Sequence, residues 1–297
     1  MEDKPKLSFF QLVEKIRNRG ITFNTHSQDQ IIDILKHRNY YYRLISYRKN
    51  FNKSKGKYID LDFAALVDLA SIDTYLREYL LQLCLDVEHT AKTLLMTHIT
   101  ENDNEDGYTI IEEFASDHES FYQKSILHFE KNRYKQDMFK KRKQISIWVF
   151  LEIIDFGTLN IFLNFYAEKY PDFKSIFNPD LLKFVKNIRN ACAHNDVFFV
   201  NIFNATHKTH RPSPNVVSFA NLMGIERNDV RFIKINDVVV LHYLHRQICS
   251  LNLNKRRNSA GKILIERVLR NSHYYDQCYQ YHRFFNLISK CVDFLTY

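Results

Sequence analysis

The segment at 185–199, VKNIRNACAHNDVFF, carries three side chains whose chemistry suits the cleavage of a phosphodiester. Arg189 is followed directly by Asn190, and His194 comes four residues later. A His can move a proton near neutral pH, and an Arg can hold a phosphate oxygen while charge builds on phosphorus. RNA supplies its own nucleophile, the 2′-hydroxyl. These residues therefore predict metal-independent cleavage that leaves a 2′,3′-cyclic phosphate and a 5′-hydroxyl.

The helical spacing of these residues leaves two interpretations open. A helix turns by about 100° per residue, so Asn190 and His194 share a face, while Arg189 lies roughly 140° from His194. A long Arg side chain can still reach the His if the helix frays near Asn195, and the small residues 191–193 leave room for a substrate or a partner helix. Alternatively, the His only caps carbonyls at a helix end and the Arg lies on a solvated face.

The elements that must position this segment are predicted to be helices. Only six Gly and five Pro occur in 297 residues, too few for the frequent turns of a β-rich fold. Ser8, Ser27 or Asp29, and Asp60 or Asp62 can each cap the start of a helix. Apolar spacing predicts an all-α chain with helices at about 9–20, 30–51, 63–100, 146–170, 181–194, 237–251, 261–271 and 273–295.

Composition and charge narrow the classes of function. The glycines stand alone, so neither a dinucleotide-binding motif nor a P-loop can be written. A net charge of +8 suits a polyanionic partner, and the many Phe and Tyr suit stacking on unpaired bases, although most of these rings are expected in the core. Five Cys without a CxxC pair, no signal-peptide core and no long apolar run predict a reduced, cytoplasmic protein outside the membrane.

Four segments resemble known protein families. NIRNACAHN (187–195) resembles the R-x4-H motif of HEPN-domain ribonucleases, in which an Asn commonly follows the Arg. Three further segments resemble, in the same order, blocks of abortive-infection proteins of the AbiD/AbiF type. They are HRNYYYRLISYRKNF (37–51), DLASIDTYLREYLLQLCLDVEHTAKTLL (68–95) and WVFLEIIDFGTLNIFL (148–163). The resemblance covers about residues 5–200.

This resemblance implies a HEPN-like helical bundle with additional N- and C-terminal helices. We therefore expect an N-terminal helical unit at 1–58 and the bundle at 59–200, with a helical insertion near 101–146. Residues 201–297, which match no motif, are expected to form a C-terminal helical extension.

The same resemblance implies an RNA endonuclease of prokaryotic anti-phage defence, with Arg189 and His194 as catalytic residues and Asn190 beside them. HEPN ribonucleases generally assemble one site from two facing motifs. This chain has one motif, so a homodimer is expected with 185–199 near the two-fold axis. Many relatives have a second His straight after the motif. Asn195 stands there in this chain, which keeps a polar, supporting side chain and loses a titratable group.

Other polar residues are candidates for supporting or RNA-binding roles. Glu88 or Glu152 can orient the catalytic pair, or can form an ordinary contact between helices. Two basic, aromatic segments can hold an RNA backbone, or can dock on the bundle and face solvent. The RNA-binding candidates are Tyr42, Arg43, Arg48, Lys49, Lys140, Lys141, Arg142 and Lys143. No metal site and no cofactor are predicted.

An enzyme that cuts cellular RNA needs restraint, so an antitoxin is expected, with a bound noncoding RNA or a protein as candidates. Two other functions stay open. One is a HEPN-fold module that binds RNA without cleaving it. The other is a toxin controlled by a neighbouring nucleotidyltransferase or kinase.

Overall fold

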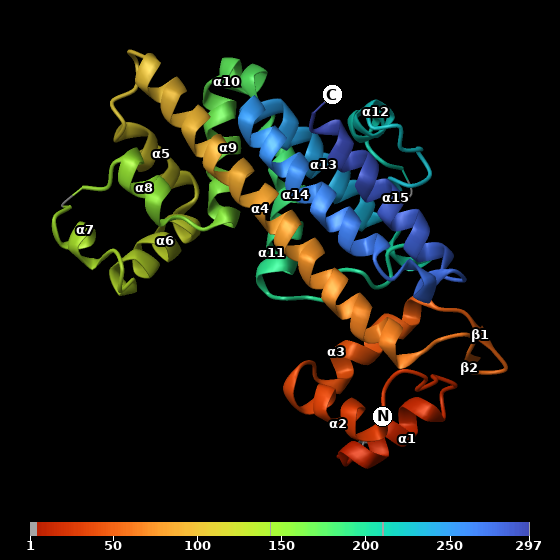
Figure 1. Cartoon of the computed structure of the whole chain (residues 1–297). Coiled ribbons are helices and arrows are strands. Elements are labelled where there is room, and N and C mark those ends of the chain that lie inside the picture. Colours follow the sequence, from red (N-terminus) through yellow and green to blue (C-terminus); the bar gives the residue numbers. More distant parts are fainter. Residues whose placement is uncertain (1–4, 143, 210, 297) are drawn as a thin grey trace.

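The longest helix, α4 (Phe63–Glu101), runs diagonally through the molecule and carries the rest of the fold (Figure 1). With 39 residues, α4 is roughly 58 Å long. Asp62, one of the two predicted caps, accepts a hydrogen bond from the Ala64 N–H at 2.9 Å. The computed structural model describes residues 5–142, 144–209 and 211–296. The all-α prediction is confirmed, since these residues add only a two-stranded hairpin to the helices.

The N-terminal unit packs at one end of α4 (Figure 1). Ser8 and Ser27 form the predicted caps, and a Gln three residues later completes a capping box in both cases. The helix expected over 30–51 is interrupted at 38–40, where Asn and Tyr favour helix weakly and Tyr40 is extended. The elements are α1 (Phe9–Arg17), α2 (Gln28–His37), α3 (Tyr41–Ser46), the 3-10 helix η1 (Tyr47–Asn50), β1 (Lys53–Ser54) and β2 (Lys57–Tyr58).

A lobe of short helices projects from the opposite end of α4 (Figure 1). Its core is aromatic, because Phe114 packs edge-to-face on Phe150 and Phe162 with ring centroids 5.6 and 5.0 Å away. The helices of this lobe are α5 (Thr109–Asp117), α6 (Glu119–Lys131), α7 (Gln136–Lys140) and α8 (Ile147–Ile153). We call it the α5–α8 lobe.

The single helix expected over 146–170 is in fact two helices, α8 and α9 (Phe156–Lys169). Asp155 lies between them and accepts a hydrogen bond from the Thr158 N–H at 2.8 Å, so it starts α9 as an N-cap. The chain continues through α10 (Pro171–Ile176) and the 3-10 helix η2 (Pro179–Leu181) to α11 (Leu182–Ala193). Helix α11 packs against α4.

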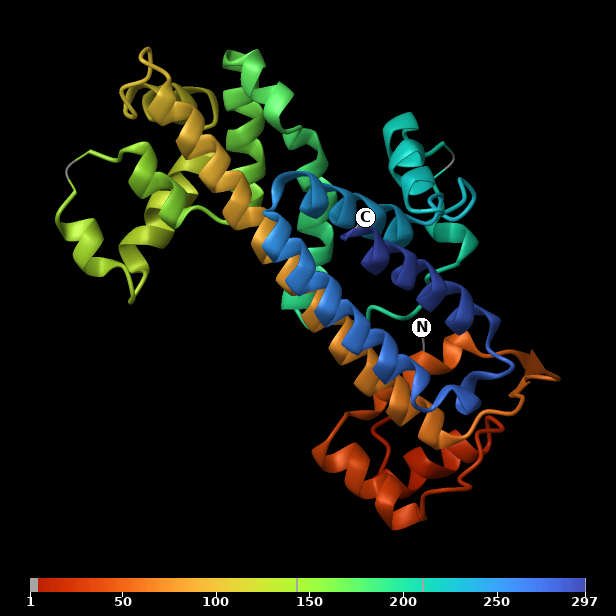
Figure 2. The ribbon, with the colours of Figure 1, turned by 45° about the horizontal axis from the view of Figure 1, so that its top comes forward.

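Two of the C-terminal helices, α13 (Ile233–Ile248) and α14 (Leu251–Leu269), pack along α4, and α13 also packs against α11 (Figures 1 and 2). Two carboxylates of α4 hold them: Asp86 pairs with Arg257 and His245, and Asp68 pairs with Arg267 at 2.6 Å. Buried ion pairs of this kind bind the last hundred residues to the bundle. The elements are the 3-10 helix η3 (Ala205–His207), α12 (Pro214–Leu222), α13 (Ile233–Ile248), α14 (Leu251–Leu269), the 3-10 helix η4 (Ser272–Tyr275) and α15 (Tyr279–Phe294).

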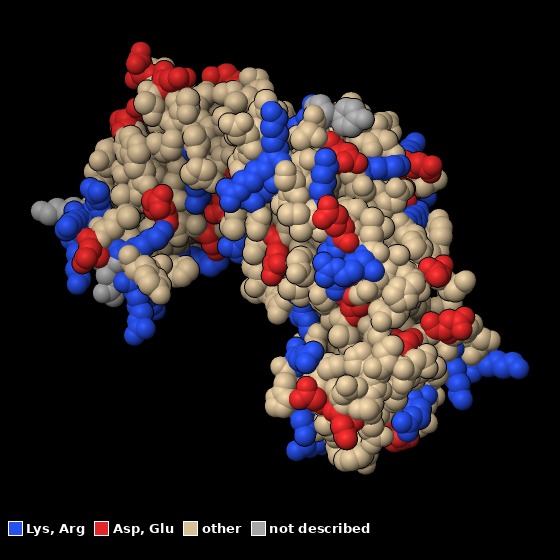
Figure 3. Space-filling model, viewed as in Figure 1, with Lys and Arg blue, Asp and Glu red and all other residues tan. Residues whose placement is uncertain are grey.

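The N-terminal unit and the α5–α8 lobe lie at opposite ends of α4 and leave a notch between them on one side of the molecule. Figure 3 shows the surface hollowed between the α5–α8 lobe and the N-terminal unit. Helix α11 ends beside this notch in both ribbon views (Figures 1 and 2). None of the described helices combines the length and the apolar character that crossing a membrane requires.

Candidate active site at the end of helix α11

Helix α11 ends in a Schellman turn that fixes the backbone at His194. The Asn195 N–H donates to the Cys192 carbonyl at 3.1 Å, and the Asp196 N–H donates to the Ala191 carbonyl at 2.9 Å. The turn needs a residue with positive φ directly after the helix cap, and Asn195 has a φ of 60°. Asn is the residue that most readily replaces Gly in this position. Asn195 thus belongs to the turn that places His194.

The side chains of Arg189, Asn190 and His194 line one open cleft of about 480 Å³. Arg189 and Asn190 are half-buried, and His194 is exposed. The other walls come from α6, with Phe121 and Lys124, and from the start of α9. The helical twist separates Arg189 from His194 around the axis of α11. Both residues nevertheless reach the cleft, because it lies at the helix end.

Positive charge predominates in this cleft. Lys124, Lys186 and Arg189 line it together with one carboxylate, Asp155, which pairs with Lys124 at 2.8 Å. Burial alone would raise the pKa of Asp155, but hydrogen bonds from Lys124 and Thr158 outweigh burial and lower that pKa to about 2. Asp155 is therefore ionised at neutral pH. Lys186 has no ion-pair partner among the described residues, so its charge is available to an anion.

The guanidinium of Arg189 is only weakly engaged. Its Nη1 donates to the Asn190 Oδ1 at 3.4 Å, near the outer limit of a hydrogen bond. No ion pair forms at Arg189 within the part of the chain that the structure describes. The group can therefore bind an incoming phosphate without breaking a strong internal contact.

The two carboxylates expected to orient Arg189 or His194 have other partners. Glu88 pairs with Lys92, one turn along α4, at 3.4 Å. Glu152 is exposed and lies 3.8 Å from Lys135. Within the described residues neither carboxylate forms a hydrogen bond or ion pair with Arg189 or His194, and neither lines the cleft.

The segment after α11 is held by a buried carboxylate for which the sequence alone predicted no role. Asp73 of α4 is fully buried and pairs with Arg77, one turn later. It accepts hydrogen bonds from the N–H groups of Phe198 at 3.3 Å and Phe199 at 2.6 Å. Arg77 also donates to the Asp196 carbonyl at 3.4 Å. The available signal was an Asp and an Arg four residues apart on a largely apolar helix.

Lys234 of α13 holds the same segment from the C-terminal helices. Its Nζ donates to the carbonyls of Phe198 at 2.6 Å and Val200 at 2.9 Å. Burial lowers the pKa of Lys234 to about 8, although the charges of Asp73 and Asp196 act in the opposite direction. The last hundred residues thus contact the loop that follows the candidate site.

A comparison with protein families decides where this chain belongs. Residues 33–200, more than half of the chain, match the family described as Abi-like protein. The chain belongs to the Abi-like protein family. The prediction of an abortive-infection family is confirmed, and this membership associates the chain with abortive infection. Searches of the curated proteins and of the solved structures found no match.

The first group of RNA-binding candidates in this Abi-like protein lies on α3 and η1. Tyr42 and Lys49 are exposed. Arg48 donates a hydrogen bond to the Ile45 carbonyl. Arg43 donates to the main-chain oxygen of Asn195 and to its Oδ1, the latter at 3.1 Å. Both terminal nitrogens of the Arg43 guanidinium thus already donate hydrogen bonds within the protein.

The second group lies at the end of α7. Lys140, Lys141 and Arg142 are exposed, and Figure 3 shows Lys and Arg gathered on this lobe. Lys143 lies outside the described residues. The first group thus lies on the N-terminal unit and the second on the α5–α8 lobe. These two parts of the molecule border the notch.

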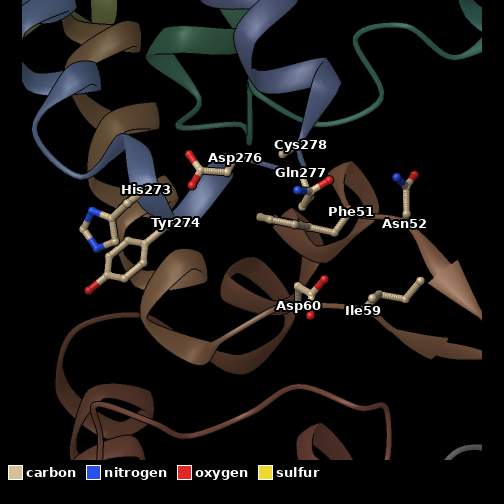
Figure 4. Close-up of a pocket in the computed structure, with 9 residues that line it drawn as sticks. All are labelled: Phe51, Asn52, Ile59, Asp60, His273, Tyr274, Asp276, Gln277 and Cys278. Carbon is tan, nitrogen blue, oxygen red and sulfur yellow. The ribbon is translucent and has the colours of Figure 1, made fainter.

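A second hollow of about 410 Å³ in the Abi-like protein lies where the N-terminal unit meets the turn before α15 (Figure 4). Phe51 and Tyr274 line it together with two carboxylates, Asp60 and Asp276. Those carboxylates disfavour an RNA backbone, so the cleft at α11 is the stronger candidate. The described residues contain no group of three or more His, Cys, Asp or Glu able to hold a metal ion.

Proposed function

We propose that this Abi-like protein is an RNA endonuclease that acts as a toxin in abortive infection. The observation that carries the proposal is the cleft shared by Arg189, Asn190 and His194, in which Lys124 and Lys186 add positive charge. The cations can neutralise a phosphodiester, and the imidazole can move a proton beside it. The proposed reaction uses no cofactor.

In this reaction the 2′-hydroxyl of the RNA attacks the adjacent phosphorus. The His194 imidazole takes the hydroxyl proton as the new O–P bond forms, and the 5′-oxygen leaves with a proton from a second imidazole or from water. Arg189 holds a non-bridging oxygen and stabilises its charge, while the Asn190 amide donates a further hydrogen bond. The products are a 2′,3′-cyclic phosphate and a 5′-hydroxyl.

A composite site in a homodimer would supply the second imidazole. His194 is exposed at the end of α11, and Asn195 stands where many relatives have another His. A two-fold axis close to α11 brings two copies of Arg189 and His194 to one cleft. A strictly monomeric protein with full activity would contradict this arrangement.

The notch is the proposed approach for RNA. Tyr42 of the N-terminal unit has an exposed ring that can stack on a base, and the exposed basic residues at the end of α7 can contact phosphates from the α5–α8 lobe. The same surface suits a noncoding RNA that restrains the enzyme. Nucleic acid of one defined length in the purified protein would support an RNA antitoxin, and a copurifying polypeptide would support a protein antitoxin.

Cleavage of a labelled single-stranded RNA in the presence of EDTA tests the proposal. The wild type and His128→Ala are expected to cleave, because His128 is an exposed residue of α6 outside the cleft. His194→Ala and Arg189→Ala are expected to lose about 100-fold or more in rate. Equal cleavage by His194→Ala and the wild type would remove His194 from the reaction. Binding by every variant with cleavage by none would favour a non-catalytic RNA-binding module.

A further inference from the structure

The turn at His194 is tied to the N-terminal unit by one side chain. Arg43 of α3 donates to both oxygens of Asn195, the main-chain carbonyl and the side-chain Oδ1, and the Oδ1 contact is 3.1 Å long. Each oxygen accepts its hydrogen bond from a different terminal nitrogen of the Arg43 guanidinium. A planar, forked donor holds such a pair in one orientation, which a single ammonium cannot do.

Asn195 meets two requirements of this contact at once. Its φ of 60° is needed for the Schellman turn, and its Oδ1 is an acceptor for Arg43. A Gly in this position would adopt the φ but would offer no side-chain acceptor. An aliphatic residue would offer neither. The residue that replaces the second His of the motif is therefore matched to Arg43.

The neighbouring contacts carry this restraint to His194. The His194 N–H donates to the Asn190 carbonyl at 2.9 Å, so its backbone is fixed on the helix side by α11. On the other side His194 is bonded directly to Asn195, whose carbonyl Arg43 holds. The imidazole is exposed and has no hydrogen-bond partner among the described residues. Its place in the cleft therefore depends on the backbone of the turn.

We propose that Arg43 is a positioning residue, which acts through Asn195 to hold His194 in the cleft rather than by binding RNA itself. The inference rests on the proposed function for its effect on cleavage. Its structural part, the restraint of residues 194–197 by the N-terminal unit, does not depend on that function. The two parts are therefore tested by different measurements.

Two variants of Arg43 separate positioning from phosphate binding. Arg43→Lys keeps the positive charge and removes the forked contact, and Arg43→Ala removes both. Positioning predicts that Arg43→Lys lowers kcat about 10-fold or more while KM changes less than about threefold. Arg38→Ala is the matched control, because Arg38 is an exposed Arg of the same unit whose side chain makes no hydrogen bond to the turn within the described residues. It is expected to change neither constant.

Amide hydrogen exchange over 194–197 measures the restraint directly in the full-length protein. Both Arg43 variants are expected to exchange at least about fivefold faster there than the wild type, with unchanged exchange in α4. Asn195→Gly keeps the turn and removes the Oδ1 contact, so it supports the test if Arg43→Ala does not fold. The double variant Arg43→Lys, Asn195→Gly is expected to have a kcat that is reduced by a smaller factor than the product of the two single reductions, because both substitutions break the same contact.

Two results would overturn the inference. Unchanged exchange over 194–197 in both Arg43 variants would show that Arg43 does not hold the turn. A rise in KM with unchanged kcat in Arg43→Ala, absent in Arg43→Lys, would show that Arg43 binds RNA through its charge. A wild-type protein that does not cleave RNA would remove the proposed function, and the exchange rates alone would then decide whether Arg43 restrains the turn.

Discussion

The Phe199 N–H donates a 2.6 Å hydrogen bond to Asp73, which joins the loop after His194 to the N-terminal third of α4. Asp73 is fully buried and also pairs with Arg77 and accepts from Tyr47 at 2.9 Å. One carboxylate therefore connects the N-terminal unit, the long helix and the loop of the candidate site. The conformation of this loop depends on a charge in the core of the bundle.

Removing that charge should destabilise the fold. Asp73→Asn keeps the size of the side chain but leaves Arg77 buried without a counter-charge. We expect the free energy of unfolding to fall by about 3–5 kcal/mol, as measured by urea denaturation. Glu14→Gln, which breaks the exposed pair with Arg17, should change it by less than about 0.5 kcal/mol. A loss below about 1 kcal/mol in Asp73→Asn would mean that the buried pair contributes little.

His245 predicts a specific pH dependence of stability. Burial alone would lower its pKa, but hydrogen bonds to Asp86, Cys249 and Asn254 together outweigh burial and raise the pKa to about 9. A folded pKa above the unfolded value gives stability that is complete below about pH 6.5 and is lost as the pH rises through about 9. Between those two pH values the free energy of unfolding of the wild type should fall by roughly 1–3 kcal/mol more than that of His245→Gln. The free energy of unfolding of both proteins is measured by denaturation across this pH range. An equal change with pH in the two proteins would contradict the pairing of His245 with Asp86.

Gly261 should be sensitive to the addition of one methyl group. A Cβ at Gly261 of α14 would lie 2.5 Å from the Val292 Cγ2 of α15, closer than atoms in contact allow. Gly261→Ala is therefore expected to destabilise the protein by about 1–3 kcal/mol in thermal or urea unfolding. Val292→Ala should recover part of the loss when combined with Gly261→Ala, because it removes the clashing methyl groups. A neutral Gly261→Ala would show that the two helices separate easily.

Lys186 should contribute to RNA binding through its charge alone. It lines the cleft and has no ion-pair partner among the described residues. In a His194→Ala background, Lys186→Ala is expected to reduce the slope of log K against log salt for single-stranded RNA by about 0.7. Fluorescence anisotropy between low and moderate salt measures the slope. Lys262→Ala, at an exposed Lys of α14, should leave it unchanged. An unaltered slope in Lys186→Ala would place the RNA backbone elsewhere.

Helix starts could be predicted from the sequence because capping is a local interaction. Ser8, Ser27 and Asp62 each cap the helix that directly follows them. The break at Asp155 was missed, since an Asp within an apolar run is compatible with either a continuous helix or a new N-cap. Phe150 of α8 packs on Phe114 of α5 and on Phe162 of α9, and this packing favours the new helix that starts at Asp155.

By itself the sequence determined the all-α class, the Abi-like family and the candidate group of Arg189, Asn190 and His194. Those inferences rest on composition, spacing and short motifs, which are properties of neighbouring residues. Only the tertiary structure decided that the three side chains share one cleft and that Arg43, Asp73 and Lys234 hold the turn and loop beside it. These residues come from α3, α4 and α13. Their contacts depend on how the helices pack, because a buried polar group takes whichever partner the fold brings within reach.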